Sequence, residues 1–324
     1  MKARTWALLL VALTAVVTAA LALGPVAIPP RVVWGALWGE GDAGVTAIVR
    51  TLRLPRVALG VVIGAGLGMS GAALQATLRN ALAEPYLLGV SGGAAVGAVL
   101  AMSAHLTGPA TLPIAAFAGA AAAVVVVLLV ARASGSRGDP RVLVMAGVVV
   151  GAFSNAAILV ILAGAPAETV RGALWWMMGS LGDATWGGAA WIGLYVGIGA
   201  ALLLVLGREI DVLALGDDPA AALGVDVEHA SRRIFLVASL LAAATVAGAG
   251  LVGFVGLVVP AIARALGARN ARAVICAAAI VGATVLVGAD LAARTALAPA
   301  ELPLGAVTAL VGVPFFLARL RKIA

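Results

Sequence analysis

The chain has 324 residues, of which 63% are hydrophobic and 11% charged, and its mean hydropathy is +1.15. No water-soluble domain of this size can carry so much apolar surface, so the composition predicts a membrane protein without room for a soluble catalytic domain. The net charge of +7 does not indicate a nucleic-acid partner, because the basic residues are scattered at the ends of apolar runs.

Ten apolar runs are long enough to predict membrane-spanning helices. In chain order they lie at about residues 6–28, 57–78, 88–104, 112–131, 142–163, 189–206, 234–252, 254–268, 273–293 and 303–318. A shorter stretch at 168–181 contains Trp175 and Trp176, which predicts an interfacial helix because indole rings prefer the headgroup level. We therefore expect an all-α polytopic membrane protein with a single transmembrane domain over residues 1–324.

The basic residues predict the orientation of these spans. With the N-terminus in the cytoplasm, 15 of the 21 Lys and Arg residues lie on the inner side and six on the outer side. Because cytoplasmic loops retain positive charge, this asymmetry predicts an N-in, C-in protein of the cell inner (cytoplasmic) membrane. Lys2 and Arg4 precede an apolar stretch that ends in the small residues Ala20 to Ala22, so a cleaved signal peptide in place of the first span is the alternative.

The second span and the segment after it combine small and polar residues. Glycine and alanine recur at four-residue steps from Gly60 to Ala72, which predicts close helix packing. A polar break follows from Asn80 to Pro85, and the apolar pattern restarts through Gly89 and Ser91. Such a break at membrane depth is tolerated only against protein or a water-filled cavity. It is therefore the expected position of a gate, with an ordinary tight loop as the alternative.

The longest predicted cytoplasmic connection is residues 208–233. Asp218 can cap a short helix that begins at Pro219, and Gly216 and Gly224 can end two short helices. Six acidic residues in this connection favour a protein partner over anionic lipid. We expect a docking element here, with a solvated loop as the alternative.

Several function classes are excluded or disfavoured by the sequence. Neither lysine follows a Gly-rich turn, so the chain has no phosphate-binding loop and ATP hydrolysis would have to come from a partner. His105 and His229 are predicted on opposite sides of the membrane, so we expect no metal or haem site and no cofactor on this chain. An ion-coupled secondary transporter is the alternative function, but an ion pair with Arg294 explains Asp290 better than a mid-membrane proton site does.

Six short motifs carry the most specific information. They are Arg53-Leu54-Pro55-Arg56, Gly71 to Gln75, Asn80 to Gly89, Leu215-Gly216 with Leu223-Gly224, Gly253 to Pro260, and Pro299 to Gly305. Together they resemble the FecCD-type permease family, the membrane subunits of ABC importers for ferric siderophores, haem and cobalamin. The resemblance covers about residues 53–321. Ala81 and Ala261 stand where the family usually has proline and histidine, which puts details of the gate and of the eighth span in doubt.

The resemblance implies a type II ABC importer permease fold, a homodimer of ten-helix subunits, two cytoplasmic ATPase subunits that hold ATP and Mg, and an external solute-binding protein. Arg53, Arg56 and Arg294 would pair with acidic residues of the binding protein, unless they only reach lipid headgroups. Contact with the ATPase would involve Asp211, Leu215, Gly216, Asp217, Asp218, Ala220, Leu223 and Gly224. The gate and pathway would involve Gln75, Asn80, Leu82, Pro85, Gly89, Ser91 and Arg141. The expected cargo is a bulky metal chelate, with a ferric siderophore first and haem or cobalamin next.

Overall fold

The computed structural model describes residues 1–134 and 140–320. Among the basic residues assigned above to the inner side, Arg137, Arg321 and Lys322 lie outside these ranges. The described residues are mostly helical. The α-helices are α1 (Ala3–Ala22), α2 (Pro30–Trp38), α3 (Ala43–Ala47), α4 (Leu54–Thr77), α5 (Val90–Ser103), α6 (Thr111–Ala133), α7 (Pro140–Ala163), α8 (Ala167–Met178), α9 (Trp186–Val205), α10 (Gly207–Leu213), α11 (Asp217–Ala222), α12 (Val227–Ala249), α13 (Val255–Ala265), α14 (Ala271–Thr295) and α15 (Leu304–Leu320). A π-helix, η1 (Ile48–Arg53), leads into α4, and a short 3₁₀-helix, η2 (Pro85–Leu88), precedes α5.

Each of the ten predicted spans is confirmed as an apolar helix. Within the described residues, seven helices are long and apolar enough to cross a membrane, and three shorter apolar helices, α5, α13 and α15, accompany them. Together these ten helices coincide with the ten apolar runs, and α8 coincides with the predicted interfacial helix. The first run ends early, at Ala22, because a glycine and three prolines follow within eight residues. The small helices α2 and α3 were not predicted.

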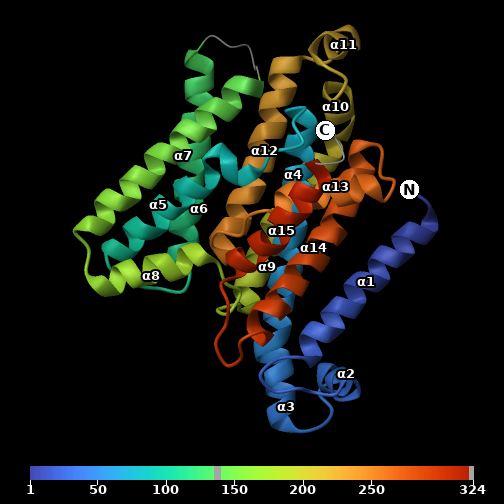
Figure 1. The fold of residues 1–324 in the computed structure, drawn as a ribbon, viewed down its shortest axis with the longest axis vertical. Helices are drawn as coiled ribbons and strands as arrows, with labels where there is room; N and C mark the ends of the chain where they lie inside the picture. The colour runs from blue at the N-terminus through green and yellow to red at the C-terminus, as the bar shows by residue number, and fades with distance from the viewer. Residues whose placement is uncertain (135–139, 321–324) are drawn as a thin grey trace.

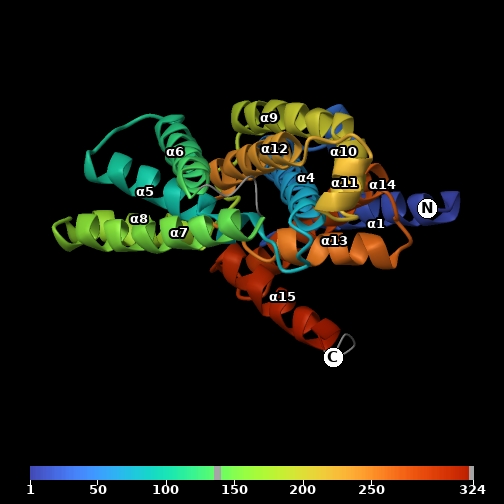
Figure 2. The same ribbon diagram turned by 90° about the horizontal axis from the view of Figure 1, so that it is seen from above.

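Figures 1 and 2 show how the helices are arranged. Helix α4 runs through the middle of the molecule and packs against α9, α12, α13 and α14. Helices α5 to α8 form a group on one side, and α1 lies at the opposite edge against α14. The start of α1, the end of α15 and the pair α10–α11 lie in the upper half of Figure 1, whereas α2 and α3 lie at the bottom. This arrangement agrees with the N-in, C-in topology.

The predicted glycine ridge on α4 brings neighbouring helices into backbone contact. A Cβ atom added to Gly64 would lie 2.3 Å from the carbonyl oxygen of Gly282 on α14, and one added to Gly68 would lie 2.3 Å from the carbonyl oxygen of Ala278 on α14 and 3.0 Å from Cγ1 of Val259 on α13. Helices in a membrane associate through such close dispersion contacts, because no hydrophobic drive between them remains. The ridge therefore fixes where α13 and α14 lie against α4.

Candidate functional site

Charged side chains meet at the end of the molecule that carries α2 and α3. Arg56 on α4 donates hydrogen bonds from Nε and Nη2 to Asp290 at 2.9–3.1 Å, and from Nη1 and Nη2 to Glu301 at 2.9 Å. Arg294 Nε lies 3.7 Å from the Asp290 carboxylate, so the predicted Asp290–Arg294 ion pair is present. The side chain of Asp290 is 3% exposed and that of Glu301 is 43% exposed. One carboxylate of the cluster is therefore sealed, and the other faces outward.

The other two arginines of this cluster point inward and hold the carboxyl end of α1. Arg53 and Arg294 are buried, and both guanidinium groups donate to main-chain carbonyls there. The acceptors are Leu21 (2.7 Å), Ala22 (2.9 Å) and Val26 for Arg53, and Ala20 for Arg294. The last carbonyls of a helix have no donor within the helix and carry partial negative charge, so guanidinium groups suit them. Of the three arginines predicted to meet a binding protein, only Arg56 reaches the surface.

The polar break after α4 lies against the connection between α12 and α13. Glu84 is buried and accepts a hydrogen bond from the N–H of Phe254, and the Tyr86 hydroxyl accepts one from the N–H of Val252. Phe254 has φ of +67°, which is uncommon for a residue other than glycine. Two breaks from distant parts of the chain thus satisfy each other's polar groups.

The helices that start from these breaks are short. Helix α5 has 14 residues and α13 has 11, so they rise by about 21 and 17 Å at 1.5 Å per residue. The hydrocarbon core is about 30 Å thick, so neither helix crosses it alone. Asp290 was the acid considered from the sequence for a position near a span, and the buried Glu84 was not singled out. Its signal in the sequence is an acid next to proline in a polar break.

The predicted gate residues are distributed over several contacts and do not form one cluster. Asn80 and Leu82 are exposed, and the Asn80 side chain accepts a hydrogen bond from the N–H of Leu82 at 2.9 Å. Ser91 donates to the Tyr86 carbonyl at 2.9 Å. Gly89 has φ of +81° and lies against α7, since an added Cβ would be 3.1 Å from the Gly147 carbonyl oxygen. Pro85 begins η2, whereas the exposed Arg141 follows a loop that lies partly outside the described residues.

Gln75 is buried and joins α4 to α13. Its Nε2 donates to the carbonyls of Leu257 at 3.0 Å and Gly256 at 3.4 Å, and its Oε1 accepts a hydrogen bond from Arg264. Pro260 lies four residues after Gly256 and has no N–H, so the helix itself cannot satisfy that carbonyl. Gln75 thus replaces a backbone donor that proline removes.

The predicted docking element contains two short helices, α10 and α11, as expected. Gly216 and Gly224, with φ of +119° and +78°, follow them. The predicted cap was wrong: Gly216 is the N-cap of α11 and Asp218 is a residue of its first turn without a capping hydrogen bond, because α11 starts one residue earlier than Asp218. Leu215 and Leu223 are 64% and 54% exposed beside charged residues. Asp217 and Asp218 are exposed, whereas Gly216 and Ala220 are buried.

Two contacts tie this element to the membrane helices. Asp211 on α10 accepts a hydrogen bond from the N–H of Ala271 at the start of α14, at 2.6 Å. Arg79 after α4 pairs with Asp217 on α11 at 2.9 Å. These contacts join α10 to the start of α14 and α11 to the end of α4.

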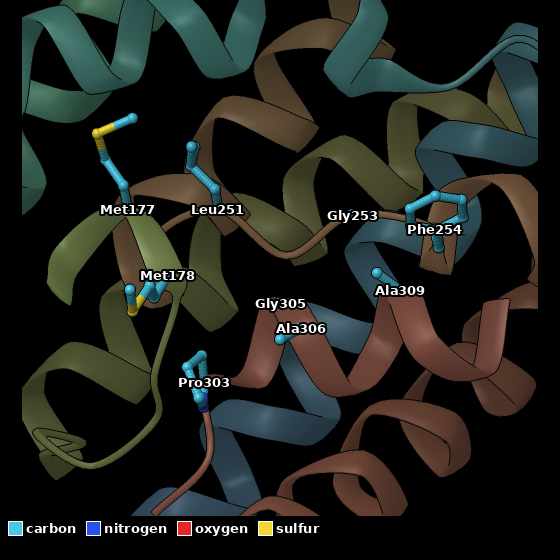
Figure 3. A pocket seen from close by; sticks show the side chains of 9 residues that line it. All are labelled: Met177, Met178, Leu251, Gly253, Phe254, Pro303, Gly305, Ala306 and Ala309. Atoms are coloured by element: carbon cyan, nitrogen blue, oxygen red, sulfur yellow. The ribbon is translucent and has the colours of Figure 1, made fainter. Parts of the chain in front are cut away.

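An apolar cavity of about 330 Å³ opens between α8, the α12–α13 connection and α15 (Figure 3). Its lining residues are Met177, Met178, Leu251, Gly253, Phe254, Pro303, Gly305, Ala306 and Ala309. Glu84 and Tyr86 hold the connection that forms one wall of it. Within the part of the chain that the structure describes, no group of three or more His, Cys, Asp or Glu side chains is placed to hold a metal ion.

Comparison with known proteins decides the family, because the model of the FecCD transport family matches residues 10–322. The chain belongs to the FecCD transport family. This permease is 41% identical over 274 residues to the cobalamin import system permease protein BtuC of Halobacterium salinarum, covering 85% of this chain and 73% of the relative. It is 37% identical over 277 residues to the hemin transport system permease protein HmuU of Yersinia pestis, covering 82% and 80%.

A solved structure shares the fold over almost the whole length. It is an inward-facing conformation of a transporter assigned to the metal-chelate type of ABC transporters, with a TM-score of 0.86, 27% identity and coverage of 97% of both chains. The chain is therefore a multi-pass inner-membrane permease of an ABC-type importer, with the type II importer fold. This membership favours ATP-driven import over the ion-coupled secondary transporter considered from the sequence.

Proposed function

We propose that this permease forms the translocation pathway of an importer for a bulky metal chelate, as a homodimer with two ATPase subunits and an external solute-binding protein. The observation that carries the proposal is the likeness to the metal-chelate transporter over 97% of both chains. The named cargoes of the two relatives, cobalamin and hemin, both hold a metal inside a large organic ligand. A ferric siderophore is the first candidate cargo, with haem and cobalamin next.

The apolar lining of the cavity supports a weakly selective pathway. Its wall is formed almost entirely by hydrocarbon and thioether groups, which contact a large ligand without fixing its orientation. Cargo selectivity would then belong to the binding protein. The gate at the inner end would involve the residues of the break after α4, with Gln75 behind it.

The pair α10–α11 would dock on the ATPase, which binds ATP and Mg. The exposed Leu215 and Leu223 are the apolar anchors of this surface, and Asp217 and Asp218 form its polar rim. Closure of the ATPase would move α10 and α11, and the contacts of Asp211 and Asp217 would pass this movement to α14 and α4. On the outer face, Arg56 would pair with a carboxylate of the binding protein, with Arg53 and Arg294 behind it.

Substitution of the two leucines tests the ATPase contact. In Leu215→Asp and Leu223→Asp variants, we expect the permease to elute as a folded protein but to lose its ATPase on co-purification. Glu228→Gln is the matched control, because Glu228 is exposed in the same connection but offers no apolar anchor. Retention of the ATPase by both leucine variants would refute this surface.

A further inference from the structure

Arg56 binds two carboxylates that differ sharply in exposure. Asp290 is sealed, with 3% of its side chain exposed, whereas Glu301 is 43% exposed and comes from the connection between α14 and α15. A sealed carboxylate cannot leave its arginine, because a buried charge without a partner is costly. An exposed pair contributes little to stability, so its members can change partners easily. Glu301 is therefore the exchangeable member of this cluster.

The guanidinium group of Arg56 has almost no donor left for another acid. Arginine offers five N–H donors. Nε and one N–H of Nη2 donate to Asp290, and the other N–H of Nη2 and one of Nη1 donate to Glu301. Arg56 can therefore form a bidentate ion pair with a new carboxylate only if Glu301 dissociates from it. The same hydrogen bonds hold the pKa of Glu301 below its ordinary value of 4.5, so this carboxylate is ionised at neutral pH.

Glu301 also lies at a position from which its release affects a pathway helix. It is three residues before Leu304, the first residue of α15. The neighbouring Leu302 donates its N–H to the carbonyl of Ala293 at 2.8 Å, and Leu304 donates to Gly179 at 3.1 Å. Pro303 and Gly305, on either side of Leu304, line the apolar cavity. The pair with Arg56 is thus one of the few polar ties that hold the entry to α15.

We propose that Glu301 is a resident carboxylate that occupies Arg56 until an acidic residue of the external binding protein replaces it, and that this exchange releases the connection into α15. The inference rests on the proposed docking of a binding protein at Arg56. It adds a specific partner chemistry, a carboxylate that reproduces the one it displaces. Through this exchange, docking at the outer surface would also move residues of the connection into α15 that line the cavity.

Affinity for the binding protein tests the exchange. The permease in nanodiscs is titrated with the purified, fluorescently labelled candidate binding protein, and Glu301→Gln is expected to lower the Kd about tenfold because the competing charge is gone. Glu168→Gln is the matched control, since it removes one exposed acid from the same face of the membrane without touching Arg56. Equal affinities of the two glutamine variants would overturn the exchange.

Two further measurements separate this inference from the docking proposal. Arg56→Lys keeps the positive charge but cannot form a bidentate pair with a carboxylate, so its affinity for the binding protein should be lower. If Arg56→Lys binds the binding protein as tightly as wild type does, the proposed docking at Arg56 is itself wrong. In a Cys276→Ala background, Leu304→Cys places a thiol at a buried position, the first residue of α15. This thiol should react faster with a maleimide when the binding protein docks, and should react fast without docking when Glu301→Gln is added. A labelling rate that docking leaves unchanged, with normal loss of binding in Arg56→Lys, refutes the exchange alone.

Discussion

Replacing Gly64 with alanine tests the close packing of α4 on α14. The added Cβ would lie 2.3 Å from the carbonyl oxygen of Gly282, 2.7 Å from its carbonyl carbon and 2.9 Å from the Cα of Ala283. All three atoms belong to the backbone, so no side-chain rotation can relieve the contact. The two helices would have to separate by about 1 Å to restore ordinary van der Waals distances of roughly 3.5 Å.

The magnitude follows from two opposing effects. Forcing an extra carbon into a packed interior costs about 1–3 kcal/mol, whereas alanine in place of glycine inside a helix gains up to about 1 kcal/mol. Gly197 on α9 offers the matched control, because nothing lies within 4 Å of its added Cβ and only the gain applies. We therefore expect Gly64→Ala to be roughly 1–3 kcal/mol less stable than Gly197→Ala.

The assay is unfolding of the purified permease in mixed micelles of a mild detergent with increasing SDS, followed by tryptophan fluorescence. Gly64→Ala should unfold at a lower SDS fraction than wild type, and Gly197→Ala at the same or a higher one. If Gly64→Ala were as stable as Gly197→Ala, the two backbones would not be in contact, and the account of how α14 is positioned would be wrong.

Three other perturbations have defined outcomes. Glu84→Ala leaves the half-buried N–H of Phe254 without an acceptor and should lower the unfolding free energy by about 1–3 kcal/mol, whereas Glu84→Gln retains an acceptor and should lower it less. Equal losses would contradict this role. Arg53→Ala leaves carbonyls at the end of α1 unpaired, so limited proteolysis between Gly24 and Pro30 should accelerate while binding-protein affinity changes less than in Arg56→Lys. The Glu301 carboxyl has a lowered pKa, so its pair with Arg56 stabilises the fold above about pH 4.5 and the benefit is lost as the pH falls through the lowered pKa. The difference in unfolding midpoint between wild type and Glu301→Gln should accordingly vanish in acid, and a difference that persisted there would exclude the ion pair as its cause.

Hydropathy and local chemistry predicted much of this architecture. The ten apolar runs, the tryptophans of α8 and the glycine ridge each depend on residues close together in the sequence, and each was found in place. The Asp290–Arg294 ion pair was also within reach, because the two residues are one helical turn apart.

The misses have a common physical cause. Whether an arginine at a helix end points outward or inward depends on hydrogen-bond acceptors that the sequence does not locate. Arg53 donates to main-chain carbonyls 27 to 32 residues earlier in the chain, at and just after the end of α1. Glu84 met its donor, Phe254, across 170 residues. Glu301 lies 245 residues from Arg56, so the sequence alone did not indicate that the outward arginine already has a ligand.

We propose that this permease imports a metal chelate with energy from ATP hydrolysis by a partner. The most direct test is uptake into proteoliposomes that contain the permease with its candidate ATPase and binding protein, offered a ferric siderophore, haem and cobalamin in parallel. We expect accumulation of one cargo only when the ATPase, ATP and the binding protein are all present. Uptake driven by a proton or sodium gradient without the ATPase would contradict it.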